Sequence, residues 1–285
     1  MDLKEISEDI RNILVEKRKE LRLSFLEDKH VYYMSDVSGK ITSKWTSVTK
    51  IVKKFHEPFD ANAKSFEMAK GDLAEQKRLL AEWKLSGHIS VNLGSRSHYE
   101  LEVDAIQRHG NYKDVRQPIF ECDDAMMVKS DKMISAGRDY LNMMMKDRGA
   151  VLLDTEMIMG HPEEGYVGQC DNAWLMMTRD ATDFGFVFSD WKTNAPKNFK
   201  VFPYNKKLFP PFSEYPDNAL GQYYLQIPLY GRLLLKMLEG TKYEKNRFLG
   251  GVLILLKEDG TYEEFKVPQY VISTMLTMDL KPFLK

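Results

Sequence analysis

Three apolar runs follow one another after Gly149, and they limit the possible folds more than any other feature of the sequence. They occupy residues 150–159, 166–177 and 184–191. Their β-branched, aromatic and aliphatic side chains are typical of strands, and turn-forming residues separate them. Residues 217–239 have the spacing of a helix, and residues 248–256 and 261–267 are typical of two more strands joined at Asp259-Gly260. This order predicts an α/β protein whose helices lie on the faces of a sheet.

The first 149 residues are dominated by helical patterns. The predicted elements are an amphipathic helix over residues 3–21, a hairpin over 23–36 and 41–46, a short helix through Phe55, and helices over 61–86, 95–109 and 123–147. Ser38-Gly39 is a suitable turn, Ser47 a suitable N-cap, and Gly87 and Gly110 the expected helix stops. We therefore expect a mainly helical N-terminal part, residues 1–149, packed on a core of residues 150–285 in one integrated domain.

Composition excludes several classes of protein. With 43% hydrophobic residues among 285, the chain can bury a sizeable core. Cys122 and Cys170 are too few for a disulfide framework, a four-thiolate zinc site or an iron–sulfur cluster. The charged N-terminus is unlike a signal peptide, and the longest aliphatic run, Val252 to Leu256, is far shorter than a membrane helix. We expect a soluble, intracellular, cytoplasmic protein without a membrane partner. Its net charge of −1 requires any DNA-binding surface to come from segregated charge.

Acidic residues within the apolar runs indicate a site. Asp190 and Lys192 end the third run and, by strand periodicity, point to the same side. A sheet interior accepts such a pair only if the two groups are paired or coordinate a metal. A hairpin through residues 179–183 would bring Asp171, in the second run, beside Asp190, and Glu156 lies in the first run.

This arrangement suits phosphodiester hydrolysis. Two carboxylates hold one or two hard divalent cations, which activate water and neutralise charge on the phosphate. A lysine beside the metal positions the water and stabilises the transition state. The backbone carbonyl of Trp191, between Asp190 and Lys192, is a further candidate ligand.

Five motifs occur in a fixed order between about residue 31 and residue 256. They are Trp45-Thr-Ser-Val-Thr-Lys-Ile-Val with Pro58-Phe-Asp60, Gly94-Ser-Arg-Ser-His98-Tyr-Glu100, Gly168-Gln-Cys-Asp171, Ser189-Asp-Trp-Lys-Thr193 and Gln226-Ile-Pro-Leu-Tyr230. The set resembles the PD-(D/E)XK nuclease superfamily, in its RecB-like and phage-type exonuclease branch, which includes lambda-type and mitochondrial genome maintenance exonucleases. The resemblance implies a restriction-endonuclease-like core, in which helices flank a mixed central sheet, and Mg²⁺ or Mn²⁺ as cofactor.

The resemblance also implies residue roles. Asp171 and Asp190 would be metal ligands and Lys192 the catalytic lysine, with Glu156 as a further acidic ligand or an orienter of one. His98 would complete a second metal position. Gln226 and Tyr230, one helical turn apart, would contact the DNA backbone or brace the ligands. Iron–sulfur members of the group have four cysteines, so the two cysteines here exclude that subgroup.

Several of these residues have structural interpretations as well. The alternative to ligation by His98 is a packed histidine, and the alternative for Glu156 is an ion-pair partner. Gln226 and Tyr230 are also compatible with a polar patch on a packed helix.

The segment Lys197–Phe212 mixes four lysines with five aromatic residues directly after the predicted active-site strand. Its Pro and Asn content predicts an irregular loop. Lysines there would follow phosphates and aromatic rings would stack on splayed bases. The candidate DNA contacts are Lys197, Lys200, Phe202, Tyr204, Lys206 and Lys207. The alternative is a loop held down by its own aromatic residues.

These inferences favour a metal-dependent DNA exonuclease that acts on free DNA ends in recombination, repair or phage DNA metabolism. Its expected partners are DNA and a single-strand annealing or single-strand-binding protein. A nicking or structure-specific endonuclease of the same fold is the main alternative. The others are a non-catalytic DNA-end-binding module and an α/β scaffold with accidental motifs.

Overall fold

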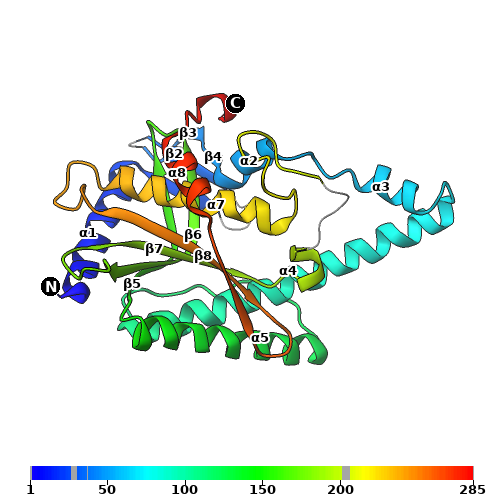
Figure 1. The fold of residues 1–285 in the computed structure, drawn as a ribbon, viewed down its shortest axis with the longest axis horizontal. Coiled ribbons are helices and arrows are strands. Elements are labelled where there is room, and N and C mark those ends of the chain that lie inside the picture. The colour runs from blue at the N-terminus through cyan, green and yellow to red at the C-terminus, as the bar shows by residue number, and fades with distance from the viewer. Residues whose placement is uncertain (1, 27–30, 37, 201–205, 285) are drawn as a thin grey trace.

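A computed structural model describes residues 2–26, 31–36, 38–200 and 206–284 (Figure 1). Its centre is a mixed sheet of six strands. The strands are β4 (Thr46–Ser47), β5 (Val151–His161), β6 (Tyr166–Met177), β7 (Phe184–Lys192), β8 (Arg247–Leu256) and β9 (Tyr262–Lys266). The pairs β5–β6, β6–β7 and β8–β9 are antiparallel, whereas β7–β8 and β4–β6 are parallel. The five apolar segments predicted as strands therefore all form strands of one sheet.

Along one edge of strand β6, a short stretch is paired with no neighbouring strand among the described residues. Its residues 166–167 pair with both β4 and β5, and its residues 172–175 pair with both β5 and β7. A strand has only two edges, so β4 and β7 share the edge opposite β5. Residues 168–171 lie between them on that edge, and this gap is where the predicted acidic motif falls.

Helices cover both faces of the sheet, as the sequence predicts. Helix α7 (Ala219–Met237) lies above the sheet in Figure 1, and α4 (Leu73–His109) and α5 (Asp124–Asn142) lie below it. Side chains along β7 and β8 point alternately to the two faces of the sheet, so both strands contribute to the hydrophobic core on each face. Phe186, Phe188, Leu253 and Leu255 pack in the cluster that contains α7 residues, whereas Trp191 and Ile254 pack in the cluster that contains α5 residues.

The N-terminal part adds a helix and a small sheet. Helix α1 (Leu3–Glu20) packs on β5, and β1 (Leu23–Leu26), β2 (Val31–Ser35) and β3 (Ile41–Lys44) form an antiparallel sheet. The predicted hairpin is therefore a three-stranded meander, because residues 23–36 form two strands rather than one. Helix α2 (Val48–Val52) continues as a 3₁₀ turn to Phe55, and Ser47 caps it by accepting the Lys50 N–H.

The prediction that a helix stops at Gly87 is wrong. After α3 (Ala61–Met68), α4 runs without interruption through Gly87 to His109, and α3 with the first half of α4 extends away from the sheet (Figure 1). A helical glycine costs only about 1 kcal/mol relative to alanine, which is too little by itself to end a long helix. Gly110, with a φ of 112°, does end the helix in the left-handed conformation.

Other elements differ from the predictions in detail. The segment predicted as irregular, residues 197–212, begins within a short helix, α6 (Pro196–Lys200), so that prediction is wrong at its start. The Met-rich helix ends in a π-helical turn (Met143–Asp147), and α8 (Gln269–Thr277) follows the last strand. Within the described ranges, no helix is long and apolar enough to cross a membrane. Cys122 and Cys170 are both free thiols.

Candidate metal centre

Glu156 and Asp171 face each other across β5 and β6. Thr155 pairs with Asn172 and Met157 with Cys170, so Glu156 lies opposite Asp171. Glu156 has a φ of 42°, the left-handed region that is rare for a residue other than glycine. Pairing with β6 continues on both sides of Glu156, with a register shift between Leu152 and Asp154. The positive φ gives Glu156 a backbone conformation that differs from those of its neighbours.

Asp171 lies where β6 and β7 separate. The last regular pair between these strands is Asn172 with Ser189. Beyond this pair the ladder is replaced by a side-chain contact, in which the Trp191 N–H donates to Asp171 Oδ2 at 2.7 Å. The carboxylate of Asp171 is thus fixed between Asp190 and Lys192 of β7, as the predicted hairpin requires.

His98 reaches the two carboxylates from α4. Its Nδ1 lies 3.5 Å from Asp171 Oδ2 and 3.7 Å from Glu156 Oε1. Gly94, one turn earlier, lets the helix approach the end of β7, because a Cβ at Gly94 would lie 3.2 Å from Thr193 Oγ1. Burial alone lowers the pKa of His98, but the charges of Asp171, Glu156 and Asp190 outweigh it and raise the pKa to about 9.

Asp190 and Lys192 lie on the same face of β7, as predicted. Lys192 Nζ forms an ion pair with Asp190 Oδ2 and lies 3.8 Å from the centroid of the Tyr223 ring. Burial lowers the pKa of Lys192, but the charge of Asp190 outweighs this and raises it above its usual value. The buried Oδ2 of Asp190 has no hydrogen bond of ordinary geometry to any group that the structure describes.

The donor set fits a divalent cation. One ligand atom each from His98, Glu156 and Asp171 lies within 4.8 Å of the others, and Asp190 adjoins them on the next strand. Carboxylate oxygens are the ligands that Mg²⁺ and Mn²⁺ prefer, and imidazole is a ligand for divalent transition metals. Burial and the charge of Asp190 raise the pKa of Asp171 well above its usual range. A cation there would offset this repulsion between the carboxylates.

Polar residues extend from the metal centre into two adjoining cavities. Gln169 Nε2 donates to Glu156 Oε2 at 2.7 Å, and the Tyr32 hydroxyl donates to Gln169 Oε1 at 3.1 Å. A cavity of about 250 Å³ is lined by His98, Glu156, Asp171, Gln226 and Tyr230, among others. A larger one, of about 550 Å³, shares His98 and Glu156 and is lined also by Tyr99, Lys113 and Arg116. The candidate metal centre therefore lies between two open spaces.

Gln226 and Tyr230 share one face of α7, and the Gln226 amide donates to the Tyr230 hydroxyl. The Tyr230 ring lies directly over Gly168, where a Cβ would come within 2.4 Å of Tyr230 Cε1. The first glycine of the Gly168-to-Asp171 motif thus allows α7 to close over the gap in β6.

Three residues that adjoin the candidate centre were given no role in the sequence analysis. Gln169 and Tyr32 orient Glu156, and Tyr223 lies under Lys192. Gln169 lies inside the Gly168-to-Asp171 motif, and Tyr223 lies one helical turn before Gln226, so these two had a positional signal. Tyr32 had none, because it lies 137 residues from Gln169 in sequence.

The basic segment after β7 is largely tied to the protein surface. Lys200 pairs with Glu263, Lys206 pairs with Glu57, and Lys207 donates to the Glu214 carbonyl oxygen at 3.3 Å. Phe199 and Phe212 are buried in the core, which favours the packed interpretation for those two rings. Phe202, Tyr204 and the side chain of Lys197 lie outside the described residues.

A scan against protein-family models and a search of curated proteins both found no match for this chain. The functional interpretation therefore depends on the geometry of the site and on the motif resemblance.

Proposed function

We propose that this protein is a metal-dependent deoxyribonuclease with a restriction-endonuclease-like core of the PD-(D/E)XK type. The observation that supports it best is the convergence of His98, Glu156 and Asp171 beside the Asp190–Lys192 pair. Four acidic or imidazole groups and one lysine, drawn from one helix and three strands, meet at the gap in β6. Clustering several carboxylates in a partly buried site is unfavourable without a counter-charge, so this arrangement is unusual for carboxylates that serve only solubility.

In this proposal, His98, Glu156, Asp171 and Asp190 hold the cation. A bound divalent cation would polarise the scissile phosphate and favour the ionisation of an attacking water. Lys192, held by Asp190 and the Tyr223 ring, presents its ammonium group to the attacking water or to the developing negative charge. In the metal-free protein the charge of Asp190 raises the pKa of Lys192, which favours an ammonium group that donates hydrogen bonds.

The cavities supply room for the nucleic-acid strand on both sides of the metal centre. Gln226, Tyr230 and the N-terminal end of α2 line the smaller one, where backbone and side-chain donors are available for a phosphate. Tyr99 and Arg116 line the larger one. Lys206 and Lys207, further along the chain, are exposed and remain candidates for more distant phosphate contacts.

The finer assignment is an exonuclease that degrades DNA from a free end, in recombination, repair or phage DNA metabolism. We expect a single-strand annealing or single-strand-binding protein as its partner in such a setting. These assignments follow from the motif resemblance.

The test is incubation of the protein with end-labelled linear DNA and with covalently closed circular DNA, each with Mg²⁺, with Mn²⁺ and with excess EDTA. The proposal predicts cleavage of linear DNA that requires either metal and leaves the circle intact. Cutting of the circle at a comparable rate would replace the exonuclease by the endonuclease alternative. Undiminished cleavage in EDTA would contradict the metal-dependent mechanism itself.

A further inference from the structure

The backbone of Glu156 is strained in a way that its own sequence does not explain. Its φ of 42° lies in the left-handed region, which is unfavourable for a residue with a Cβ. Glutamate has no side-chain preference for this region, unlike asparagine or glycine. Such a conformation persists only where surrounding groups hold it.

A lysine outside the metal centre holds the peptide bond that precedes Glu156. Lys113 Nζ donates to the Thr155 carbonyl oxygen at 2.6 Å. That carbonyl belongs to the peptide group that joins Thr155 to Glu156. The φ of Glu156 is the torsion about its N–Cα bond, so it sets how this peptide group is rotated relative to Glu156. A charged donor on the carbonyl therefore acts directly on the torsion that is strained.

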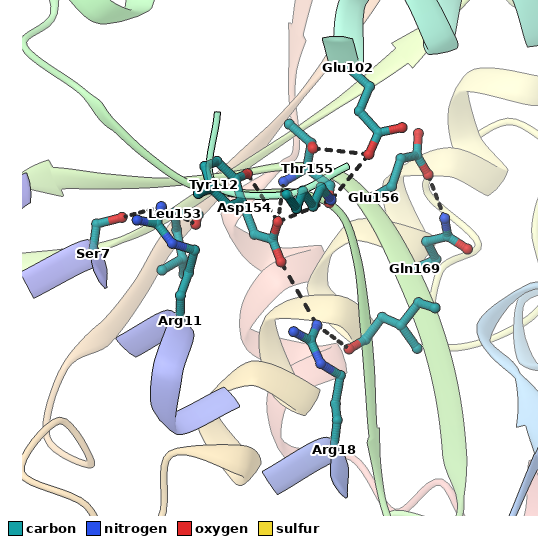
Figure 2. A network of polar contacts seen from close by, with 12 residues as sticks. Ser7, Arg11, Arg18, Glu102, Tyr112, Leu153, Asp154, Thr155, Glu156 and Gln169 are labelled. Atoms are coloured by element: carbon teal, nitrogen blue, oxygen red, sulfur yellow. Dashed lines mark hydrogen bonds and ion pairs between the residues drawn. The ribbon is translucent and has the colours of Figure 1, made fainter. Parts of the chain in front are cut away.

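Two carboxylates hold Lys113 in turn. Its Nζ lies 3.1 Å from Glu102 Oε1 and 3.2 Å from Asp154 Oδ1. The Thr155 hydroxyl donates to the same Glu102 oxygen at 3.2 Å. Figure 2 shows Glu102 approaching Thr155 from one side, while Glu156 turns away towards Gln169. Glu102 lies one turn after His98 on α4, so the helix that supplies the imidazole also anchors the strand at Thr155.

The far end of the same network reaches α1. Asp154 accepts from the Tyr112 hydroxyl at 3.1 Å and lies 3.8 Å from Arg18 Nη1 (Figure 2). Arg11 also donates to the Leu153 carbonyl oxygen at 3.2 Å. The residues before Glu156 are thus fixed from two directions, and the Glu156 carboxylate is fixed at its other end by Gln169.

From this geometry we infer that Lys113 is a positioning residue, which holds the Thr155–Glu156 peptide so that the Glu156 carboxylate points into the metal centre. Lys113 acts in this role through the backbone of Glu156 and does not touch the cation or the reacting atoms. The expected effect of Lys113 on cation binding rests on the proposed metal-dependent function. The effect of Lys113 on the backbone of Glu156 does not depend on that function.

The first test is metal affinity, measured by calorimetric titration of Mn²⁺ into the full chain. Lys113→Met should weaken binding about 10- to 100-fold, the usual effect of removing a group that orients a ligand. Lys113→Arg keeps a charged donor and should restore most of the affinity. Lys129→Met is the matched control, because Lys129 pairs with Glu258 at 2.9 Å on the surface and should bind Mn²⁺ as the wild type does. Thr155→Val removes only the hydroxyl bond to Glu102 and should have a smaller effect than Lys113→Met.

The second test is the crystal structure of Lys113→Met without metal, which separates the inference from the proposed function. The inference predicts that Glu156 relaxes to a negative φ and that its carboxylate leaves His98. A left-handed Glu156 in that variant, or unchanged Mn²⁺ affinity, would overturn the role of Lys113 and leave the proposed function standing. A wild-type protein that binds no Mn²⁺ would overturn the proposed function, while the φ of Glu156 in the metal-free variant would still decide whether Lys113 holds this backbone.

Discussion

Replacing Lys192 by Met tests the catalytic assignment most sharply, because the chain contains a matched control. The Lys192 side chain is only 12% exposed, pairs with Asp190 and lies over the Tyr223 ring. Lys200 repeats this arrangement at the surface, where it pairs with Glu263, lies 4.8 Å from the Phe265 ring and is 41% exposed. The two substitutions remove the same group from the same kind of contact, in one case beside the metal centre and in the other away from it.

The expected effects differ in both size and kind. Loss of the lysine beside the metal should reduce turnover about 10³-fold, equivalent to about 4 kcal/mol of transition-state stabilisation. Breaking a buried pair also destabilises the fold, by up to about 3–5 kcal/mol, because Asp190 loses its counter-charge. For Lys200→Met the exposed ion pair contributes only about 0.2–1 kcal/mol, and turnover should be unchanged.

The assay is single-turnover cleavage of end-labelled linear DNA, with each rate corrected for the folded fraction found by urea unfolding. Lys192→Met with a tenth or more of the wild-type rate would refute the assigned role. An equal loss of turnover in Lys200→Met would show that the assay reports surface charge rather than catalysis.

The remaining predictions concern one ligand, His98, and two glycines that affect helix packing and helix stability. With a pKa of about 9, His98 is mostly protonated at pH 7 in the metal-free protein, so cation binding should release a proton and tighten as the pH rises towards 9. Because this pKa is raised on folding, the stability that His98 contributes is complete below about pH 6.5 and disappears as the pH rises through 9. Titrations in buffers of different ionisation enthalpy measure the proton release, and binding without any release would contradict His98 as a ligand. Gly168→Ala should destabilise the protein by about 1–3 kcal/mol, because the new Cβ would lie 2.4 Å from the Tyr230 ring. Gly87→Ala, with nothing within 4 Å of its Cβ, should instead stabilise α4 by up to about 1 kcal/mol. Urea unfolding of both variants checks the two signs, and a neutral Gly168→Ala would contradict the packing of α7 over β6.

The sheet and the clustering of Asp171 with Asp190 and Lys192 were predictable because their signals are local. Long apolar runs identify β5 to β8, and strand periodicity alone places Asp190 and Lys192 on one face. The hairpin between β6 and β7 then brings Asp171 beside them, since the connecting turn is short. These features depend on residues that are close in sequence.

The features that escaped prediction depend on contacts between distant residues. Strand β4 contains only two residues, which is too short for any periodic pattern. Gly87 resembles a helix stop, yet the helix continues because nothing at that exposed position favours another conformation. The left-handed backbone of Glu156 has no signal in its own sequence, because Lys113, 42 residues away, holds the preceding carbonyl.

The most direct measurement of the central claim is an anomalous difference map from crystals of the wild-type protein soaked in Mn²⁺. The proposed function predicts a peak within coordination distance of His98, Glu156 and Asp171, and loss of that peak in crystals of His98→Ala with Asp171→Asn. A map without a peak at these residues, or with its main peak elsewhere on the molecule, would contradict the metal centre and with it the proposed nuclease.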